Sequence, residues 1–329
     1  MDDILTALRA CAEPTRLRLL ALAASGSFCV MDFTKILGQS QPRLSRHLRL
    51  LHEAGLLERV REGANVWLAL PPADSAPGSL VRALLDRVPD DDATLAADRR
   101  QAARVVAERA RAASEIFRRA GADWDEMRAL GLPAATVEQA LLDLLPARIG
   151  RLLDIGTGTG RLLEVLAPHT ASAIGVDASR AMLALARARL ARPQDRRTHG
   201  LGHCAVRLGD MYRLPTPDAQ FDVVILQMVL HHAEDPAGAL AEAARALRPG
   251  GLLVVIDLAA HADAEMLTRL AHRWPGFAEP AMRELLRAAG LDPRPAVTVP
   301  GPLEIRLWSA SHAAAAAMPI RADILETTA

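Results

Sequence analysis

Apolar residues recur at helical spacing through the N-terminal part of the chain, between short breaks at glycine. Residues 14–25 and 30–37 each form such a stretch, and a third stretch, 41–54, carries Leu44, Leu48 and Leu51 on one face. Residues 56–60 and 66–70 then read as two strands around a polar turn, which predicts a hairpin. Several helices followed by a hairpin are typical of a winged helix-turn-helix.

The periodicity changes after the proline-rich residues 71–77, and the chain divides there. We place the winged helix-turn-helix at 1–75 and a helical connector or dimerisation region at 76–134. Its longest predicted helix runs from about residue 93 to 120. From 135 to 312, apolar strands alternate with helices, which predicts an α/β fold with a doubly wound parallel sheet. Residues 313–329 form a tail that we leave unassigned.

Composition narrows the class of protein without choosing a function. The chain has 329 residues, of which 50% are hydrophobic and 24% charged, so two domains with substantial cores are expected. The formal net charge is zero, which requires any nucleic-acid affinity to come from a local patch. The three cysteines are far apart, and neither a basic leader nor a membrane-length apolar run is present. We expect a reduced, cytoplasmic protein that does not enter a membrane.

The segment Leu152–Arg161 combines a strand, a glycine-rich turn and the start of a helix. Gly156, Gly158 and Gly160 lack Cβ atoms, so a ligand can approach the backbone closely. The spacing is G-x-G-x-G, whereas a dinucleotide site favours G-x-G-x-x-G. Asp154 would repel a pyrophosphate and suits a ligand that carries an ammonium and a sulfonium. A degenerate nucleotide loop or a plain strand-to-helix turn remains the alternative.

Further candidate residues follow the ends of the next strands. Asp177 ends the second strand, where a carboxylate can accept ribose hydroxyls or, alternatively, begin a helix. Asp210 and Met211 follow the third strand and suit an adenine ring. His231 and His232 follow the fourth strand and can accept a proton near neutral pH, although a histidine packed on the sheet is the alternative. We predict no metal site.

The helix at 41–54 carries polar residues away from its leucine stripe, as a helix that reads the DNA major groove does. Between residues 39 and 61, arginines outnumber glutamates five to two. Arginines on the hairpin are placed to contact phosphates. A solvated face of a protein-interaction module is the alternative. The predicted DNA-binding residues are Ser40, Gln41, Arg43, Ser45, Arg46, Arg59 and Arg61.

The segment SQPRLSRHLRLLHEAGLLERVREG at 40–63 resembles the ArsR/SmtB winged-helix repressors. The resemblance covers about the first 70 residues and implies a homodimer that binds an inverted-repeat operator in double-stranded DNA. Metal-sensing members carry a Cys-Val-Cys run where this chain has Cys29, Val30 and Met31. Residues 71–150 contain neither histidine nor cysteine, so we do not expect metal sensing.

The series DIGTGTG, GVD, GDM, FDVVILQMVLHHAEDP and LRPGGLLVVID resembles the class I S-adenosylmethionine (SAM) methyltransferases, closest to the ubiquinone/menaquinone group. It implies a seven-stranded Rossmann-like sheet and SAM as cofactor. By this resemblance Asp154, Gly156 and Gly158 hold the methionine part, Asp177 the ribose, and Asp210 with Met211 the adenine. The full predicted pocket also includes Thr157, Gly160, Met182 and Gln227. Phe117 and Trp124 resemble an aromatic pair that covers this pocket in the family.

Two functions remain open from the sequence. One is a methyltransferase with an unknown small-molecule acceptor, fused to its own DNA-binding module. The other is a non-catalytic regulator that senses SAM or S-adenosylhomocysteine. Arsenite methylation needs several thiolates, and the predicted methyltransferase region has only Cys204.

Overall fold

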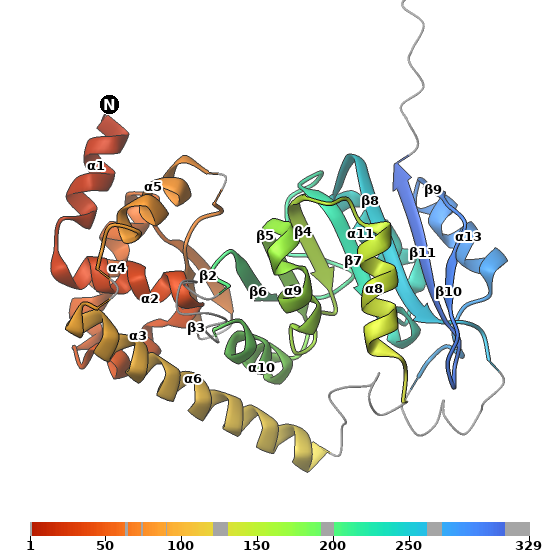
Figure 1. Cartoon of the computed structure of the whole chain (residues 1–329), viewed down its shortest axis with the longest axis horizontal. Helices are drawn as coiled ribbons and strands as arrows, with labels where there is room; N and C mark the ends of the chain where they lie inside the picture. The colour runs from red at the N-terminus through yellow and green to blue at the C-terminus, as the bar shows by residue number, and fades with distance from the viewer. Residues whose placement is uncertain are drawn as a thin grey trace, which may run out of the picture.

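The computed structural model describes residues 2–62, 65–73, 75–89, 91–120, 131–191, 201–261 and 272–312, without the side chains of 113–120. Figure 1 shows a mostly helical N-terminal body beside a C-terminal α/β body, with one long helix running along the lower side of the first. The candidates Phe117 and Trp124 lie outside the described side chains, as does the tail at 313–329.

The N-terminal body is a winged helix-turn-helix, as the sequence predicts. Its helix α2 begins at Pro14, with the Glu13 carboxylate accepting a hydrogen bond from the Arg16 amide at 2.8 Å. A two-residue strand that the sequence analysis missed pairs Phe28 with Leu68 and adds a third strand to the hairpin. The elements are α1 Asp2–Cys11, α2 Pro14–Ser25, β1 Phe28–Cys29, α3 Val30–Leu37, α4 Gln41–Glu53, β2 Glu58–Glu62 and β3 Asn65–Ala69.

Helices α5 (Ala76–Leu85) and α6 (Ala93–Ala120) follow the hairpin. Helix α6 buries Ala102 and Val105 in the core of the winged helix-turn-helix. Arg18 of α2 also donates two hydrogen bonds to the Asp98 carboxylate of α6, each 2.7 Å long. Figure 1 shows that α6 continues beneath α10 of the second body, and these two helices are in contact. The helix therefore belongs to the N-terminal core and also touches the α/β body.

The α/β body contains a sheet in the order β10-β11-β8-β7-β4-β5-β6. Strands β6, β5, β4, β7 and β8 are parallel to their neighbours, and β11 is antiparallel to β8. The strands are β4 Ile149–Ile155, β5 Thr170–Asp177, β6 Cys204–Leu208, β7 Phe221–Gln227, β8 Leu247–Leu258, β9 Leu291–Pro293, β10 Val297–Val299 and β11 Ile305–His312. The helices are α8 Ala134–Leu144, α9 Arg161–Leu166, α10 Arg180–Leu190, α11 Pro236–Ala246 and α13 Glu279–Ala288, with short 3₁₀ turns at Ala167–His169 and Leu230–His232.

The predicted α/β class and Rossmann-like sheet are confirmed, with two differences in the strands. The expected seven strands form the path of the sheet, and the short strand β9 pairs with the end of β11 as an eighth. Its sequence, Leu-Asp-Pro, has two residues that are rare in strands and gives no alternating pattern. Strand β8 is also longer than its apolar run, because it begins at Leu247 and includes Pro249–Gly251.

Both faces of the sheet are buried. In β4, Leu152 packs in a core with α8, α9 and α10, whereas Leu153 packs in a second core with α11 and α13. A parallel strand that is covered on both faces has an almost continuous run of apolar residues, which explains the apolar sequences of β4 and β7. Among the described residues, every helix is too short or too polar to span a bilayer.

Candidate functional site

The turn between β4 and α9 has the backbone that its glycines predict. Gly156 and Gly160 have φ of +73° and Gly158 has φ of +51°, in the left-handed region that disfavours side chains. A Cβ on Gly156 would lie 2.4 Å from Cγ2 of Val229, whereas the heavy atom nearest to a Cβ on Gly158 would be the Gly156 carbonyl oxygen, 4.0 Å away. Gly156 therefore permits close packing against the loop after β7, and Gly158 leaves space above the backbone.

Asp154 lies beneath this turn and is 2% exposed. Its carboxylate accepts a hydrogen bond of 2.6 Å from the Thr157 hydroxyl. Burial is the main cause that raises the pKa of Asp154 to about 7, with a smaller contribution from the nearby Asp177 and against the Thr157 hydrogen bond, which lowers the pKa. A cationic group placed here would favour the ionised carboxylate, which fits the ammonium proposed from the sequence.

Asp177 joins the first two strand-to-helix turns. Its two carboxylate oxygens accept hydrogen bonds from the Gly158 amide at 2.9 Å and the Ser179 amide at 2.7 Å. Burial is the main cause that raises the pKa of Asp177, against these two hydrogen bonds. The helix α10 is capped by Ser179, whose hydroxyl accepts from the Met182 amide at 3.3 Å. Ser179 is therefore the capping residue of α10, and the Asp177 carboxylate links the glycine turn to the turn after β5.

The remaining predicted pocket residues lie at the same edge of the sheet. The Gly209 amide donates to the Asp177 carbonyl oxygen, which sets the turn carrying Asp210 and Met211 beside the end of β5. Gln227 ends β7, the neighbour of β4. Because β6, β5, β4 and β7 are adjacent and parallel, the residues at their carboxyl ends gather at one edge of the sheet, where ligands bind in open α/β folds. We call the residues predicted for the SAM pocket the donor site, because SAM is the methyl donor.

His231 lies in the turn after β7 and is completely buried. Its Nδ1 atom lies 2.6 Å from Oδ1 of Asp257, a buried residue of β8. The Asp257 carboxylate also accepts from the amides of Leu230 at 3.1 Å, His231 at 3.2 Å and Leu258 at 2.8 Å. Since this carboxylate is surrounded by donors, Nδ1 carries the proton in a neutral His231 ring and Nε2 carries the lone pair.

Two residues near His231 were missed by the sequence analysis. Asp257 stands alone in the apolar run of β8, and a carboxylate inside a buried strand is an indication that could have been used. His272 belongs to no motif, yet its ring lies 4.2 Å from that of His231 and 5.1 Å from that of His232, between centroids. The three imidazoles therefore form a compact group beside the predicted donor site.

The three cysteines lie in the interior of the molecule. Cys11, Cys29 and Cys204 are all buried and reduced. Burial raises the pKa of the Cys204 thiol to about 12, so the thiolate is scarce at neutral pH.

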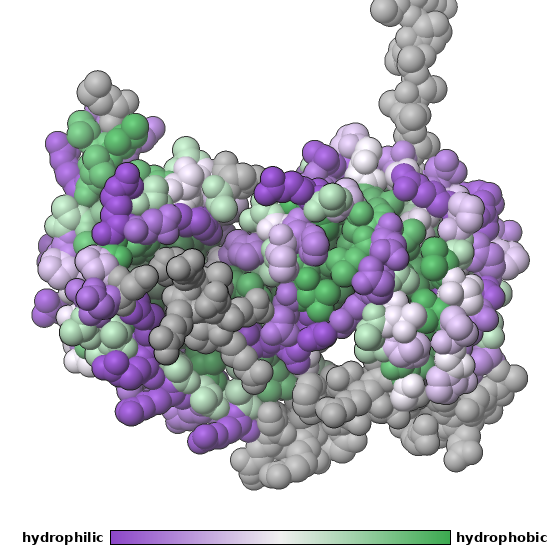
Figure 2. Space-filling view, viewed as in Figure 1, coloured by the Kyte–Doolittle hydropathy of each residue, from purple (hydrophilic) through white to green (hydrophobic). Residues whose placement is uncertain are grey.

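The predicted DNA-reading helix α4 presents its polar side outward. Leu44, Leu48 and Leu51 are buried in the domain core, as predicted. Ser45 is half-buried. The other predicted DNA-binding residues are exposed, namely Ser40, Gln41, Arg43 and Arg46 on and beside α4, and Arg59 and Arg61 on β2. Figure 2 shows that hydrophilic residues also gather on the outward side of α6.

The hairpin is fastened to the α/β body by a buried ion pair. Arg187 of α10 donates to Glu62 of β2 at 2.7 Å, and the same Glu62 oxygen accepts from the Leu208 amide at 3.0 Å. The Arg187 guanidinium also lies over the Trp67 ring, 3.6 Å from its centroid. Burial lowers the pKa of Arg187, while Glu62 raises it. We call Glu62, Trp67, Arg187 and the Leu208 amide the hairpin contact.

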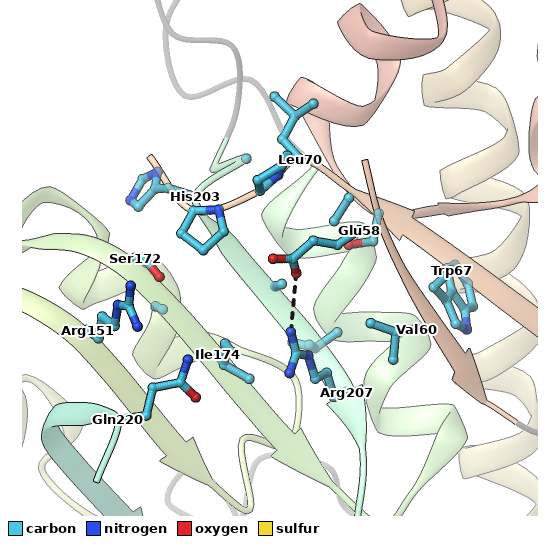
Figure 3. A pocket seen from close by; sticks show the side chains of 18 of the residues that line it. Glu58, Val60, Trp67, Leu70, Arg151, Ser172, Ile174, His203, Arg207 and Gln220 are labelled. Carbon is cyan, nitrogen blue, oxygen red and sulfur yellow. Dashed lines mark hydrogen bonds and ion pairs between the residues drawn. The ribbon is translucent and has the colours of Figure 1, made fainter. Parts of the chain in front are cut away.

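A cavity of about 80 Å³ lies beside this contact, between the hairpin and the strands of the sheet. Figure 3 shows Glu58 and Arg207 approaching each other across it, with a 3.4 Å ion pair, and His203 at its rim. None of the predicted donor-site residues lines it. The cavity is also small compared with the roughly 300–1,000 Å³ of ordinary ligand pockets, so we do not assign the donor to it.

Two family models match the chain. One is described as a methyltransferase domain and matches residues 153–255, and the other as a bacterial regulatory protein of the arsR family and matches residues 13–59. The first match includes the glycine turn, Asp177 and the His231–His232 turn, and the second includes all of α4.

Individual relatives match parts of the chain. A 37.1 kDa transposon protein of Streptomyces fradiae is 42% identical over 126 residues, which are 37% of this chain and 34% of the relative. A demethylmenaquinone methyltransferase of Tropheryma whipplei is 37% identical over 109 residues, 32% of this chain and 41% of the relative. The 27-O-demethylrifamycin SV methyltransferase of Amycolatopsis mediterranei is 33% identical over 189 residues, 54% of this chain and 67% of the relative.

The fold, the glycine turn and the similarity to known proteins together identify the class of protein. The chain belongs to the class I SAM-dependent methyltransferases and carries an arsR-family regulatory domain in front of that domain. It spans only about a third to two fifths of the length of the Streptomyces and Tropheryma relatives.

Proposed function

We propose that this protein transfers a methyl group from SAM to a hydroxyl of a small-molecule acceptor and binds DNA through its N-terminal domain. The observation that carries the proposal is the joining of Asp177 to the glycine turn through the Gly158 amide, beside the buried Asp154. Two of the relatives are named as methyltransferases of small molecules, which supports an acceptor of that kind.

The residues at the sheet edge suit the parts of SAM. Asp154 provides a buried carboxylate for the ammonium, and the space above Gly158 admits the ligand next to the backbone. Asp177 is placed for the ribose hydroxyls, and Asp210 with Met211 for the adenine. Thr157, Gly160, Met182 and Gln227 complete the proposed pocket. When bound, SAM supplies an electrophilic methyl group on a sulfonium.

On the acceptor side, we propose that His231 takes the hydroxyl proton. Asp257 fixes the imidazole of His231 with Nδ1 protonated, so Nε2 is the basic atom. The burial of His231 limits rotation of this ring. His232 is exposed and placed to contact the acceptor. The alternative expected from the sequence, a histidine packed on the sheet, accounts for the burial of His231. We favour the base because Nδ1 of His231 faces a buried carboxylate, which orients the ring for proton transfer.

For the N-terminal domain, we propose that α4 enters the major groove of an inverted-repeat operator, with Gln41, Arg43 and Arg46 near base edges and Arg59 and Arg61 near phosphates. A homodimer would place two copies of α4 on the two half-sites. The exposure of these side chains and the arsR-family match support this assignment. A cytoplasmic location accords with both proposed activities.

One observation favours a second candidate function, a sensor of SAM or S-adenosylhomocysteine. The hairpin contact holds Glu62 against Leu208 and α10, and these elements directly adjoin Asp210 and Asp177 of the proposed donor site. A ligand that shifts α10 would therefore shift the hairpin that flanks the DNA. Enzyme and sensor share this ligand and differ in whether an acceptor is methylated.

Two measurements test the proposal. Titration calorimetry with SAM should show binding that Asp177→Ala weakens at least tenfold, while Asp292→Ala, an exposed aspartate on β9, leaves it unchanged. Equal affinities in all three proteins would remove the donor-site assignment. SAM carrying a labelled methyl group is then incubated with the protein and a small-molecule cell extract. Transfer of label to a low-mass product supports the enzyme, and SAM binding without transfer supports the sensor.

A further inference from the structure

We propose that His231, His232 and His272 form a binding site for one divalent transition-metal ion, with zinc as the best fit. Their candidate ligand atoms all lie within 4.8 Å of one another. Two of the three residues, His231 and His272, are buried. Three imidazoles from two separate segments are a common ligand set for zinc, which then keeps a further position open.

The strongest support comes from the residue behind His231. The buried Asp257 carboxylate accepts from Nδ1 of that histidine and thereby presents Nε2, with its lone pair, to the other two rings. Histidines that ligate metals nearly always donate their second ring nitrogen to a carboxylate or a carbonyl. Asp257 is therefore a positioning residue, and its negative charge also favours a cation on the far side of the ring.

The backbone brings the third ligand into place. The His231 carbonyl oxygen accepts hydrogen bonds from the amides of Arg273 at 3.0 Å and Trp274 at 3.1 Å, which holds these residues and the adjacent His272 against the turn after β7. The Trp274 indole also donates to the Ala233 carbonyl oxygen at 2.8 Å. These bonds clamp the segment on both sides of the two histidines, so the group is a product of the fold.

The spacing of the rings suits an ion after a small adjustment. Zinc binds imidazole nitrogens at about 2.0–2.1 Å, which separates neighbouring nitrogens by about 3.3 Å in a tetrahedral site. The ligand atoms here reach 4.8 Å, so rotation of the exposed His232 and a shift of roughly 1 Å would close the set.

The chemical role that we infer rests on the proposed methyl transfer. With the three histidines as ligands, an acceptor hydroxyl would occupy the open position, and its pKa would fall. The proton then passes to water, the oxygen forms a bond to the methyl carbon, and the carbon–sulfur bond breaks with its electron pair remaining on sulfur. In the metal-bound protein His231 is therefore a ligand, and the ion replaces it as the group that activates the hydroxyl.

The test uses the full chain without a polyhistidine tag, treated with EDTA and then titrated with Co²⁺, which takes zinc-like geometry and absorbs visible light. We expect visible absorption bands that saturate at one equivalent and disappear when Zn²⁺ is added. His232→Gln, an exposed position that should fold normally, and His272→Gln should each abolish the bands. Asp257→Asn should weaken binding about 10- to 100-fold.

The matched control is His203→Gln, because His203 binds the Ala167 carbonyl oxygen at the opposite side of the sheet. This variant should keep the bands, and all variants should retain SAM affinity by calorimetry. Wild-type protein that gives no saturable bands, or bands that survive His232→Gln and His272→Gln, would overturn the metal site. Normal SAM binding in that case would leave the proposed methyl transfer standing, so the two failures are distinguishable.

Discussion

Several buried carboxylates lie beside a basic side chain in the described part of the chain, and two of these pairs are used differently. In the hairpin contact, Glu62 faces Arg187 at 2.7 Å, and in the turn after β7, Asp257 faces His231 at 2.6 Å. Arginine remains charged at any physiological pH, whereas histidine changes charge near neutrality. Similar geometry therefore fixes two domains in one region and prepares a titratable group in the other.

The surroundings of the two pairs strengthen this difference. Arg187 is enclosed by Trp67 on one side and the α/β body on the other, so neither partner of the hairpin contact meets a substrate. His231 instead shows its second edge to His232 and His272. The partner of the buried carboxylate, and what lies beyond that partner, distinguish the structural pair of the hairpin contact from the pair that we propose to be functional.

The largest effect is expected at the functional pair. His231→Ala should lower kcat for methyl transfer about 10²- to 10⁴-fold, because the acceptor hydroxyl loses the group that activates it. SAM affinity should change little, since His231 lies outside the proposed donor pocket. Single-turnover measurements with the identified acceptor would check this. A variant with full activity would remove His231 from the chemistry, whether as base or as metal ligand.

At the structural pair, the loss should appear in stability. Glu62→Ala leaves Arg187 buried without its carboxylate and should lower the free energy of unfolding by about 3–5 kcal/mol. Urea unfolding measures the change. The control is Glu58→Gln, which breaks a more exposed pair with Arg207 at 3.4 Å and should cost at most about 1 kcal/mol. Similar losses in both variants would mean that the hairpin contact is not a special constraint.

Some parts of the molecule can be predicted from the sequence, and others cannot. The glycine turn and helix α4 follow from local rules, since backbone freedom and apolar spacing are visible within a few residues. The hairpin contact joins residues far apart in the chain, and nothing local distinguishes Glu62 from a solvated hairpin residue. His272 was missed for the same reason, because only the fold brings it to His231.

A smaller effect, independent of the buried pairs, is expected at helix α4. Arg46→Ala should weaken operator binding by about 1–3 kcal/mol if this side chain reads a base, and SAM affinity should not change. Gel-shift titration at fixed salt measures the loss. Arg287→Ala, at the end of α13 in the α/β body, is the control and should bind DNA normally. Unchanged DNA affinity in Arg46→Ala would exclude α4 as the recognition helix.

Asp154 is a further buried carboxylate, and it differs from Glu62 and Asp257 because its hydrogen-bond partner is the neutral Thr157 hydroxyl. Its pKa is raised to about 7 in the folded protein, so it stays protonated where the unfolded chain is ionised. The free energy of unfolding should therefore fall as pH rises from about 4 to about 7, if Asp154 dominates. A bound ammonium would reverse the preference and favour the ionised form.

SAM affinity should accordingly rise by up to about tenfold between about pH 6 and pH 7 and level off above that, because binding must displace the proton of Asp154 below its pKa. Calorimetry in buffers of different ionisation enthalpy would detect the released proton. Asp154→Asn should bind SAM weakly with a flat pH profile. Thr157→Val removes the hydrogen bond that favours the carboxylate and should move the rise to higher pH. A wild-type profile that is flat and releases no proton would show that the ammonium binds elsewhere.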